Sequence, residues 1–195
     1  MESISRLGTQ EADLEIVVAT IRLISTFTPA TAEIVASALH ETRPPMETCF
    51  ICRKHNGQES APPGGYIYED EHWMVCHAPG KLGPLGTLFV ESKRHFLDYA
   101  EMTDEEAASL GLVMRKIYGA LRTHTEAERI YQVTLMEGVP HFHSWLVPHR
   151  KEDPEKGMKF LARDDSCSEE DAMALAKTLR ETLRKADWQS APRKP

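Results

Sequence analysis

The sequence predicts an α+β domain in which antiparallel strands pack against one long central helix. Three observations support this class: alternating apolar segments between 66 and 147, a strong helix start at Thr103, and turn-rich sequence between the segments. The 195 residues are 41% hydrophobic and 27% charged, which is typical of a globular protein and excludes collagen-like and wholly disordered chains. We expect an N-terminal extension (1–45), a central domain (46–150) and a C-terminal loop and helix that pack on it (151–195).

The N-terminal extension is predicted to be helical. Apolar residues recur at helical spacing from Leu14 to Ile24 and from Ile34 to Leu39. Thr28-Pro29 separates the two helices, because proline does not continue a helix interior. Arg43-Pro44-Pro45 marks the boundary with the domain. The extension either packs on the domain, which we favour, or contacts a partner or a second copy of the chain.

The first half of the domain is predicted to contain a loop and two strands. A polar loop rich in Gly and Pro covers 56–65, and strands follow over 66–78 and 87–91. The turn-rich sequence Pro79-Gly80-Lys81-Leu82-Gly83-Pro84 separates them.

The long helix begins at Thr103-Asp104-Glu105-Glu106, which is a capping box. The Thr103 hydroxyl can accept from the backbone N–H near Glu106 while the Glu106 side chain reaches back. Strands are predicted over 129–135 and 141–147, and Ser168-Glu169-Glu170-Asp171 starts a C-terminal helix. The two helices have apolar residues at helical spacing: Leu110, Val113, Met114, Ile117 and Leu121 in the first, and Leu175, Leu179 and Leu183 in the second.

Charge and hydropathy exclude several classes of function. The 23 basic and 30 acidic residues give a net charge of −7, which argues against a general grip on a nucleic-acid backbone but leaves room for a small phosphorylated ligand. No segment approaches the roughly 20 apolar residues that span a bilayer, and the N-terminus is a poor secretory signal. Four cysteines are too few for a disulfide scaffold. We therefore expect a cytoplasmic protein without a membrane partner.

Two histidines and a tryptophan share one face of the predicted strand 141–147. Alternate side chains of a strand point the same way, so His141, His143 and Trp145 lie together. Two imidazoles on one face are metal ligands, a nucleophile with its helper, or a chance pairing. His124 and His149 are predicted to be solvated surface histidines.

The sequence Cys49-Phe50-Ile51-Cys52 is a candidate metal or redox motif. Both thiolates of a Cys-x-x-Cys turn can reach one zinc ion, which takes four ligands in a tetrahedron. Imidazoles must complete the set, because a second Cys-x-x-Cys is absent, and the candidates are His55, His95, and His141 or His143. A redox pair is the rival interpretation, but no thioredoxin-like βαβ pattern follows the motif.

The motifs from Cys49 to about Arg150, and their order along the chain, resemble those of the histidine triad (HIT) superfamily of nucleotidyl hydrolases and transferases. The matching segments are Cys-Phe-Ile-Cys, Tyr68-Glu69-Asp70-Glu71-His72, Gly86-Thr87-Leu88-Phe89-Val90-Glu91-Ser92-Lys93-Arg94-His95, the helix from Thr103 and His141-Phe142-His143-Ser144-Trp145-Leu146-Val147-Pro148. The family signature is His-φ-His-φ-His-φ-φ, where φ is apolar.

The resemblance implies a HIT-like fold, with an antiparallel sheet of about five strands around the long helix, and a catalytic role for the central domain. It makes His143 the nucleophile that attacks the α-phosphate of a nucleotide or nucleotide conjugate, forming a nucleotidyl-histidine. It places a structural Zn²⁺ on Cys49, Cys52, His95 and His141, as in zinc-bearing bacterial members. Backbone N–H groups near Gly138 would meet phosphate oxygens, and a homodimer would form through the helix and the sheet edge.

Three features depart from the family pattern. Trp145 replaces the third histidine and offers one N–H donor but no titratable proton. The galactose-1-phosphate uridylyltransferase branch also lacks that histidine, which favours transfer over hydrolysis. The loop 134–139 is short, and Cys76-His77-Ala78-Pro79 stands where many members have an aspartate for the ribose. His77 either faces the ligand or is a solvated or packing histidine.

Two other functions compete with this interpretation. The first is a non-catalytic nucleotide-binding or scaffold protein, with a structural zinc and with residues 1–45 recruiting a partner. The second is a hydrolytic zinc enzyme in which His141 and His143 both bind the metal.

Overall fold

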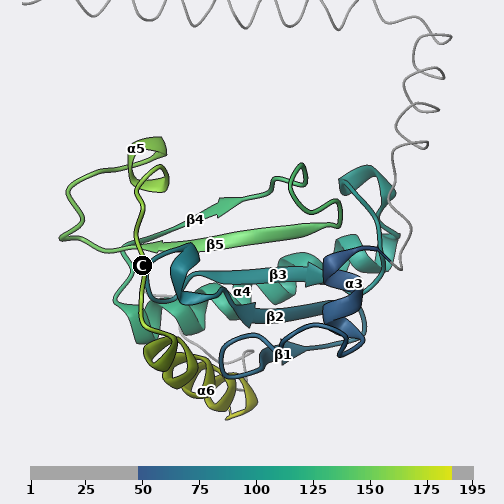
Figure 1. Ribbon diagram of the computed structural model, residues 1–195, viewed down its shortest axis with the longest axis horizontal. Coiled ribbons are helices and arrows are strands. Elements are labelled where there is room, and N and C mark those ends of the chain that lie inside the picture. Colours follow the sequence, from purple (N-terminus) through teal and green to yellow (C-terminus); the bar gives the residue numbers. More distant parts are fainter. Residues whose placement is uncertain (1–47, 186–195) are drawn as a thin grey trace, which may run out of the picture. The chain divides into compact units, whose positions relative to one another are not determined.

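The computed structural model describes residues 48–185, so the predicted helices of the extension lie outside the described residues. Five antiparallel strands form one sheet in the order β1-β2-β3-β5-β4 (Figure 1), which confirms the predicted α+β fold. The strands are β1 (Tyr66–Glu69), β2 (Trp73–His77), β3 (Leu88–Ser92), β4 (Arg129–Val133) and β5 (His143–His149).

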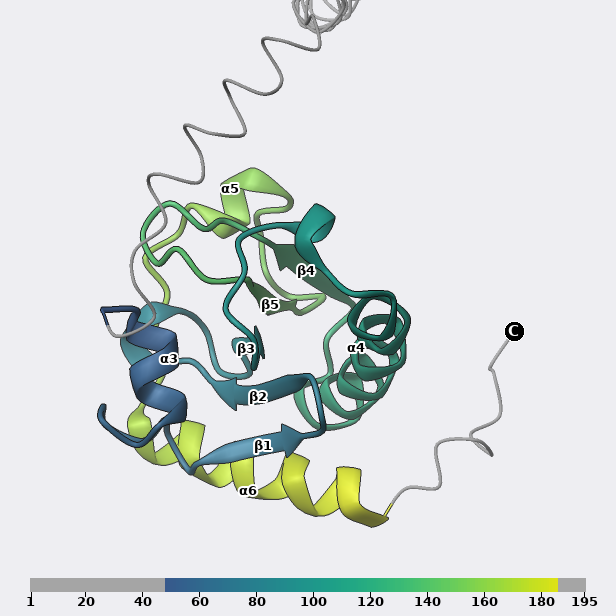
Figure 2. The same ribbon diagram turned by 90° about the vertical axis from the view of Figure 1, so that its right-hand side faces the viewer.

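Helices cover the sheet on both faces and along one edge. They are α3 (Phe50–His55), α4 (Asp104–Thr125), α5 (Met158–Leu161) and α6 (Glu169–Lys185), with short 3-10 turns η1 (Gly80–Leu82) and η2 (Tyr99–Glu101). Figure 2 shows α4 on one face, α3 on the opposite face, and α6 running beside β1. Within the described residues, no helix has the length and apolarity needed to cross a membrane.

The capping box that starts α4 forms as predicted. The Thr103 hydroxyl accepts from the Glu106 backbone N–H at 3.2 Å, and the Glu106 carboxylate accepts from the Thr103 N–H at 2.8 Å. Arg94 also contacts that carboxylate, at 2.7 Å, which ties the helix start to the end of β3. The apolar face of α4 then packs on the sheet, so the core lies between α4, α6 and one sheet face.

Two predicted strands have different bounds in the structure. The segment 66–78 is a hairpin, because the Asp70 carboxylate accepts from the backbone N–H groups of His72 and Trp73 at 2.9 and 2.8 Å and turns the chain. The strand predicted over 141–147 begins at His143 and passes through Pro148. Proline is tolerated there because the pairing with β3 ends at Leu146, leaving only β4 as a neighbour.

The prediction that His124 and His149 are solvated surface histidines is wrong. His149 is fully buried, its Nε2 contacts the Glu155 carbonyl at 2.9 Å, and the Tyr131 and Phe160 rings pack edge-on against it. His124 is half-buried and its Nε2 lies 2.8 Å from the Thr182 hydroxyl. In both cases the segment after β5, which includes the unpredicted α5, folds back over the domain.

Candidate active site and metal centre

The candidate site lies on the sheet face opposite the core. Strand pairing sets Glu91 of β3 beside His143 of β5, and Phe89 beside Trp145. Cys76 of β2 pairs with Phe89 on its other side. Helix α3 covers this face in Figure 2.

A cavity of about 770 Å³ opens between α3 and these strands. Its walls are mainly apolar with a few polar groups, which is typical of small-molecule sites. The lining residues used below are Phe50, Lys54, Cys76, Phe89, Glu91, Val139, His143 and Trp145. The start of α6 closes one side through Glu169 and Met173.

Four buried side chains lie close together: Cys49, Cys52, His95 and His141. The Nδ1 atom of His141 lies 3.4 Å from Cys49 Sγ and 3.5 Å from Cys52 Sγ. The Nδ1 atom of His95 lies 3.4 Å from Cys52 Sγ and 3.2 Å from His141 Nδ1. All four donor atoms are within 4.8 Å of one another. Residues up to 92 positions apart therefore converge on one point.

These separations fit a tetrahedral zinc ion. Zinc bonds of about 2.3 Å to sulfur and about 2.0 Å to nitrogen place tetrahedral S···N and N···N pairs about 3.5 and 3.3 Å apart. Burial raises the pKa of Cys52 to about 12, so its thiolate needs a cation beside it. Burial lowers the pKa of His141 to about 4, which keeps that imidazole neutral, as a metal ligand must be.

The protein holds His141 in place through its other ring nitrogen. Nε2 of His141 donates to the Ser92 carbonyl at 2.7 Å, and the Ser92 hydroxyl lies 3.1 Å away. Such an outer contact fixes the ring orientation of a metal-ligating histidine. His55, another candidate from the sequence, does not join the cluster, because its Nε2 bonds the Glu91 carboxylate at 3.0 Å instead. No disulfide joins the two cysteines.

His143 faces the cavity with one defined tautomer. Its Nδ1 lies 2.8 Å from the His141 carbonyl, which can only accept, so Nδ1 is the donor and, in the neutral ring, Nε2 carries the lone pair. The residue is 7% exposed, so the imidazole is sheltered from bulk water but borders the cavity. Among residues 48–185 the ligand cluster does not include His143, which gives no support to a metal bound by both His141 and His143.

Trp145, His77 and Gly138 are the other site residues predicted from the sequence, and only the first two line the cavity. Trp145 is half-buried on the cavity wall, with its ring 4.6 Å from the Phe89 ring. His77 borders the cavity, yet its Nδ1 donates to the Ala78 carbonyl at 2.6 Å and its Nε2 accepts from the Gly86 N–H at 2.9 Å. Both nitrogens are therefore used in packing the β2–β3 turn. Gly138 does not line the cavity, whereas its neighbour Val139 does.

A buried ion pair on the cavity wall was missed from the sequence. Lys54 and Glu91 are 8% and 1% exposed and their side chains are in contact, with Cys76 Sγ 3.7 Å from Lys54 Nζ. Burial works to lower the pKa of Lys54, but Cys76 and Glu91 raise it overall. Burial also raises the pKa of the Cys76 thiol, which leaves Glu91 as the anion. Lysine and glutamate are usually solvated, so no local signal marked this pair.

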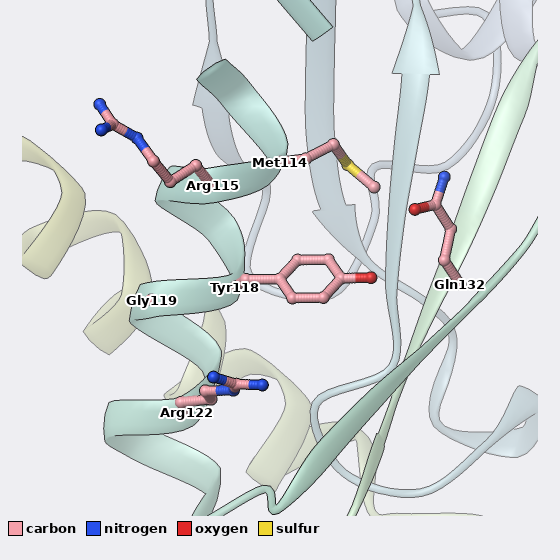
Figure 3. A pocket seen from close by; sticks show the side chains of 6 residues that line it. All are labelled: Met114, Arg115, Tyr118, Gly119, Arg122 and Gln132. Carbon is pink, nitrogen blue, oxygen red and sulfur yellow. The ribbon is translucent and has the colours of Figure 1, made fainter. Parts of the chain in front are cut away.

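A second cavity lies on the opposite side of the sheet, beside α4. It has a volume of about 440 Å³ and is lined by Met114, Arg115, Tyr118, Gly119 and Arg122 of α4 with Gln132 of β4. Figure 3 shows the Tyr118 ring extending from the helix towards the strand that carries Gln132. Among the described residues, its lining contains no histidine, cysteine or carboxylate.

The structure of this chain is similar to several solved structures. No family model and no curated protein matches the sequence. A hypothetical histidine triad nucleotide-binding protein from Sulfolobus tokodaii strain7 matches with a TM-score of 0.56 and 21% identity, over 70% of this chain and 92% of that one. A zinc-bound histidine triad family protein from Mycobacterium smegmatis matches with a TM-score of 0.56 and 24% identity, over 73% and 100%.

A third structure, a Hit-like protein involved in cell-cycle regulation from Bartonella henselae, matches with a TM-score of 0.55 and 16% identity, over 69% of this chain and 96% of that one. All three are less than 25% identical to this chain, and the fold is what they share with it.

Proposed function

We propose, from the histidine triad fold that this chain adopts, that it is a nucleotide phosphohydrolase or nucleotidyltransferase acting at the α-phosphate through His143. One observation carries the proposal: the His143 imidazole borders the large cavity with Nδ1 donating to the His141 carbonyl. The neutral Nε2 is then the nucleophile, and a lone pair on a sheltered imidazole is suited to attack on phosphorus.

The reaction takes two displacements. Nε2 of His143 forms a bond to the α-phosphorus, and the bond from phosphorus to the leaving group breaks, with the electron pair leaving on that group. The resulting nucleotidyl-imidazolium keeps its proton on Nδ1, which donates to the His141 carbonyl, and this hydrogen bond stabilises the positive charge. The oxygen of water, or of a phosphate-bearing acceptor, then forms a bond to phosphorus and loses its proton, where it has one, to solvent. The bond from phosphorus to Nε2 breaks, and its electron pair returns to His143. Trp145 can donate one hydrogen bond but supplies no proton, which favours leaving groups that depart as stable anions.

Cys49, Cys52, His95 and His141 would hold a structural zinc ion. A site with four protein ligands is closed, so the metal would supply charge neutralisation and rigidity rather than an activated water. Its effect on the reaction would be indirect, because His141 is both a ligand and the residue whose carbonyl orients His143. The reduced thiols that this requires support a cytoplasmic location.

A burst experiment tests this function. The full chain is mixed with an adenosine phosphoramidate, a dinucleoside polyphosphate or a nucleoside diphosphate sugar, and leaving-group release is followed from the first turnover. A covalent intermediate predicts a burst close to one equivalent per chain where its breakdown is slow. Turnover with inversion of configuration at phosphorus would instead show a single direct displacement and contradict the proposal.

A second function, nucleotide binding without catalysis, is favoured by Trp145 at the position of the third histidine. It predicts that nucleotides bind the cavity without being consumed. It also predicts that His143→Ala leaves the biological activity unchanged, which is where the two proposals separate.

We also propose that the chain forms a homodimer through α4 and the edge strand β4, which pairs only with β5 among the described strands. The second cavity and the exposed Leu112 lie on α4. Met114→Glu, which places a charge in that cavity, is expected to convert the dimer to a monomer in sedimentation experiments. Met158→Glu on α5, where the side chain is 78% exposed, is the control and should leave the mass unchanged. A wild-type monomer at all concentrations would contradict this proposal.

A further inference from the structure

The Lys54–Glu91 pair lies directly beside the candidate nucleophile. Strand pairing sets Glu91 of β3 opposite His143 of β5. Residues paired in this way have their side chains on the same face of the sheet, with Cβ atoms about 5 Å apart. Lys54 contacts the Glu91 carboxylate from α3, and all three side chains line the large cavity. A ligand group held at His143 therefore adjoins the pair.

The charges that line the cavity make Lys54 important for an anionic ligand. Among the described residues, two lysines line the cavity: Lys54, which is 8% exposed, and Lys81, which lies on the surface in η1. The carboxylates of Glu59, Glu91 and Glu169 outnumber them. A phosphate that enters a cavity lined by more carboxylates than cations is repelled unless a cation lies close to it. Lys54 is the lysine that the strand register places next to His143.

Stability does not explain why this pair is buried. Taking two charges out of water costs free energy, and an apolar pair of similar size is often as stable or more so. The two side chains also line the cavity rather than lying in the core between α4, α6 and the sheet. A buried charged pair in a cavity beside a candidate nucleophile indicates a role towards a ligand.

The contacts of the pair leave one donor for that ligand. An ammonium group has three N–H donors, and within residues 48–185 Glu91 and Cys76 accept two of them. Both oxygens of the Glu91 carboxylate are bonded as well, one by Lys54 and the other by Nε2 of His55 at 3.0 Å. Glu91 is therefore held and offset by its neighbours, whereas the third N–H of Lys54 is available to a group in the cavity.

Attack by His143 on a phosphate needs such a donor. Phosphoryl transfer is catalysed mainly by positioning and by stabilising the charge on the phosphate oxygens. Trp145 offers a single N–H and no positive charge. An α-phosphorus about 3.5 Å from Nε2 lies in the part of the cavity that the pair borders.

We propose that Lys54 is a catalytic residue whose third N–H binds a non-bridging oxygen of the α-phosphate while His143 attacks. Glu91 is a positioning residue that holds the Lys54 ammonium in place. The inference rests on the proposed function, because it places the α-phosphate at His143. No bond to Lys54 forms or breaks, and its protons stay on Nζ.

Calorimetry with the four nucleoside 5′-monophosphates and the corresponding nucleosides tests the contact. The double variant Lys54→Met/Glu91→Leu is used, because a single substitution would leave one buried charge unpaired. We expect it to bind the monophosphates about 10- to 100-fold more weakly, the range for hydrogen bonds to charged groups. Its affinity for the nucleosides should stay within about twofold, since they lack the phosphate. A merely structural role would not separate the two kinds of ligand.

The rate of nucleotide transfer to His143 tests the catalytic role. In single-turnover experiments with a reactive nucleotide, the double variant should form the His143 adduct about 10²- to 10³-fold more slowly, as expected when a donor to a developing anion is removed. Lys54→Arg keeps a cation beside Glu91 and should form the adduct at least about 10-fold faster than the double variant.

The matched control removes a Lys–Glu pair outside the cavity, Lys93→Met/Glu69→Leu, and should keep the wild-type affinities and rate. Melting temperature and zinc content show that each variant is folded with its metal site intact. If the apolar pair does not fold, Lys54→Gln/Glu91→Gln removes the charges with little change of shape and should show the same selective loss.

Two results would overturn the inference. One is a folded Lys54/Glu91 variant with wild-type affinities and adduct rate, and the other is a variant whose nucleoside affinity falls as far as its monophosphate affinity. An adduct on His143 of the wild type would in either case leave the proposed function standing. A wild type that forms no adduct and turns over no substrate would overturn both.

Discussion

His143→Ala is expected to lower turnover of a reactive nucleotide by about 10³-fold or more, because the variant has no atom that can form the covalent intermediate. The fold should survive, since the His143 ring borders a cavity and, within residues 48–185, makes one hydrogen bond, to the His141 carbonyl. Steady-state kinetics with each substrate of the panel measures the loss. Nucleoside monophosphate binding should persist, because the rest of the cavity is unchanged.

His124→Ala is the matched control for this prediction. His124 is a half-buried histidine that contacts Thr182 and does not line the large cavity, so its loss should leave turnover within about twofold. The metal content of His143→Ala tests the remaining alternative, a zinc enzyme in which His141 and His143 both bind the metal. Retention of zinc agrees with four ligands that exclude His143, whereas release of zinc would favour an enzyme whose metal His143 helps to bind. Full activity of His143→Ala would remove His143 from the mechanism.

Cys52→Ser is expected to abolish stoichiometric zinc binding and to lower the melting temperature by about 10 °C or more. Cys52 supplies one of four donors, and its thiolate contacts both ligand histidines. Loss of the site frees the N-terminal end of α3 and the segment that carries His141. Activity should fall as well, because the His141 carbonyl orients His143. Metal analysis and thermal unfolding of the purified chain measure these effects.

The chain offers a matched cysteine for comparison. Cys167 is half-buried and lies outside the cluster, so Cys167→Ser should keep both the metal and the melting temperature. A chelator should reproduce the effect of Cys52→Ser on the wild type and have no further effect on the variant. Equal stability of Cys52→Ser and wild type in the presence of zinc would contradict a structural role for the site.

The elements with local signals were predictable from the sequence. The start of α4 is encoded within four residues by the Thr103 capping box, and the order of the strands along the chain follows from alternation. The hairpin at Asp70 was missed because one carboxylate turns the chain inside a segment that is otherwise apolar. His149 was wrongly expected on the surface, since its burial depends on residues that follow it and fold back.

The candidate site was only partly predictable. The spacing of Cys49 and Cys52 predicted two ligands of a metal site but did not decide which histidines complete it. The resemblance to the histidine triad family selected His95 and His141. The structure brings that set together across strands that are distant in the sequence. The Lys54–Glu91 contact had no signal, because it depends on α3 covering β2 and β3.

Peptide mapping of a trapped intermediate tests the central claim most directly. The full chain is mixed with a reactive nucleotide, quenched in alkali to preserve a phosphoramidate bond, digested and analysed by mass spectrometry. We expect one nucleotidyl group per chain, on the peptide from 141 to 149 and on His143 within it, and none in His143→Ala. Turnover with an unmodified His143, or a nucleotidyl group on another residue, would contradict the account.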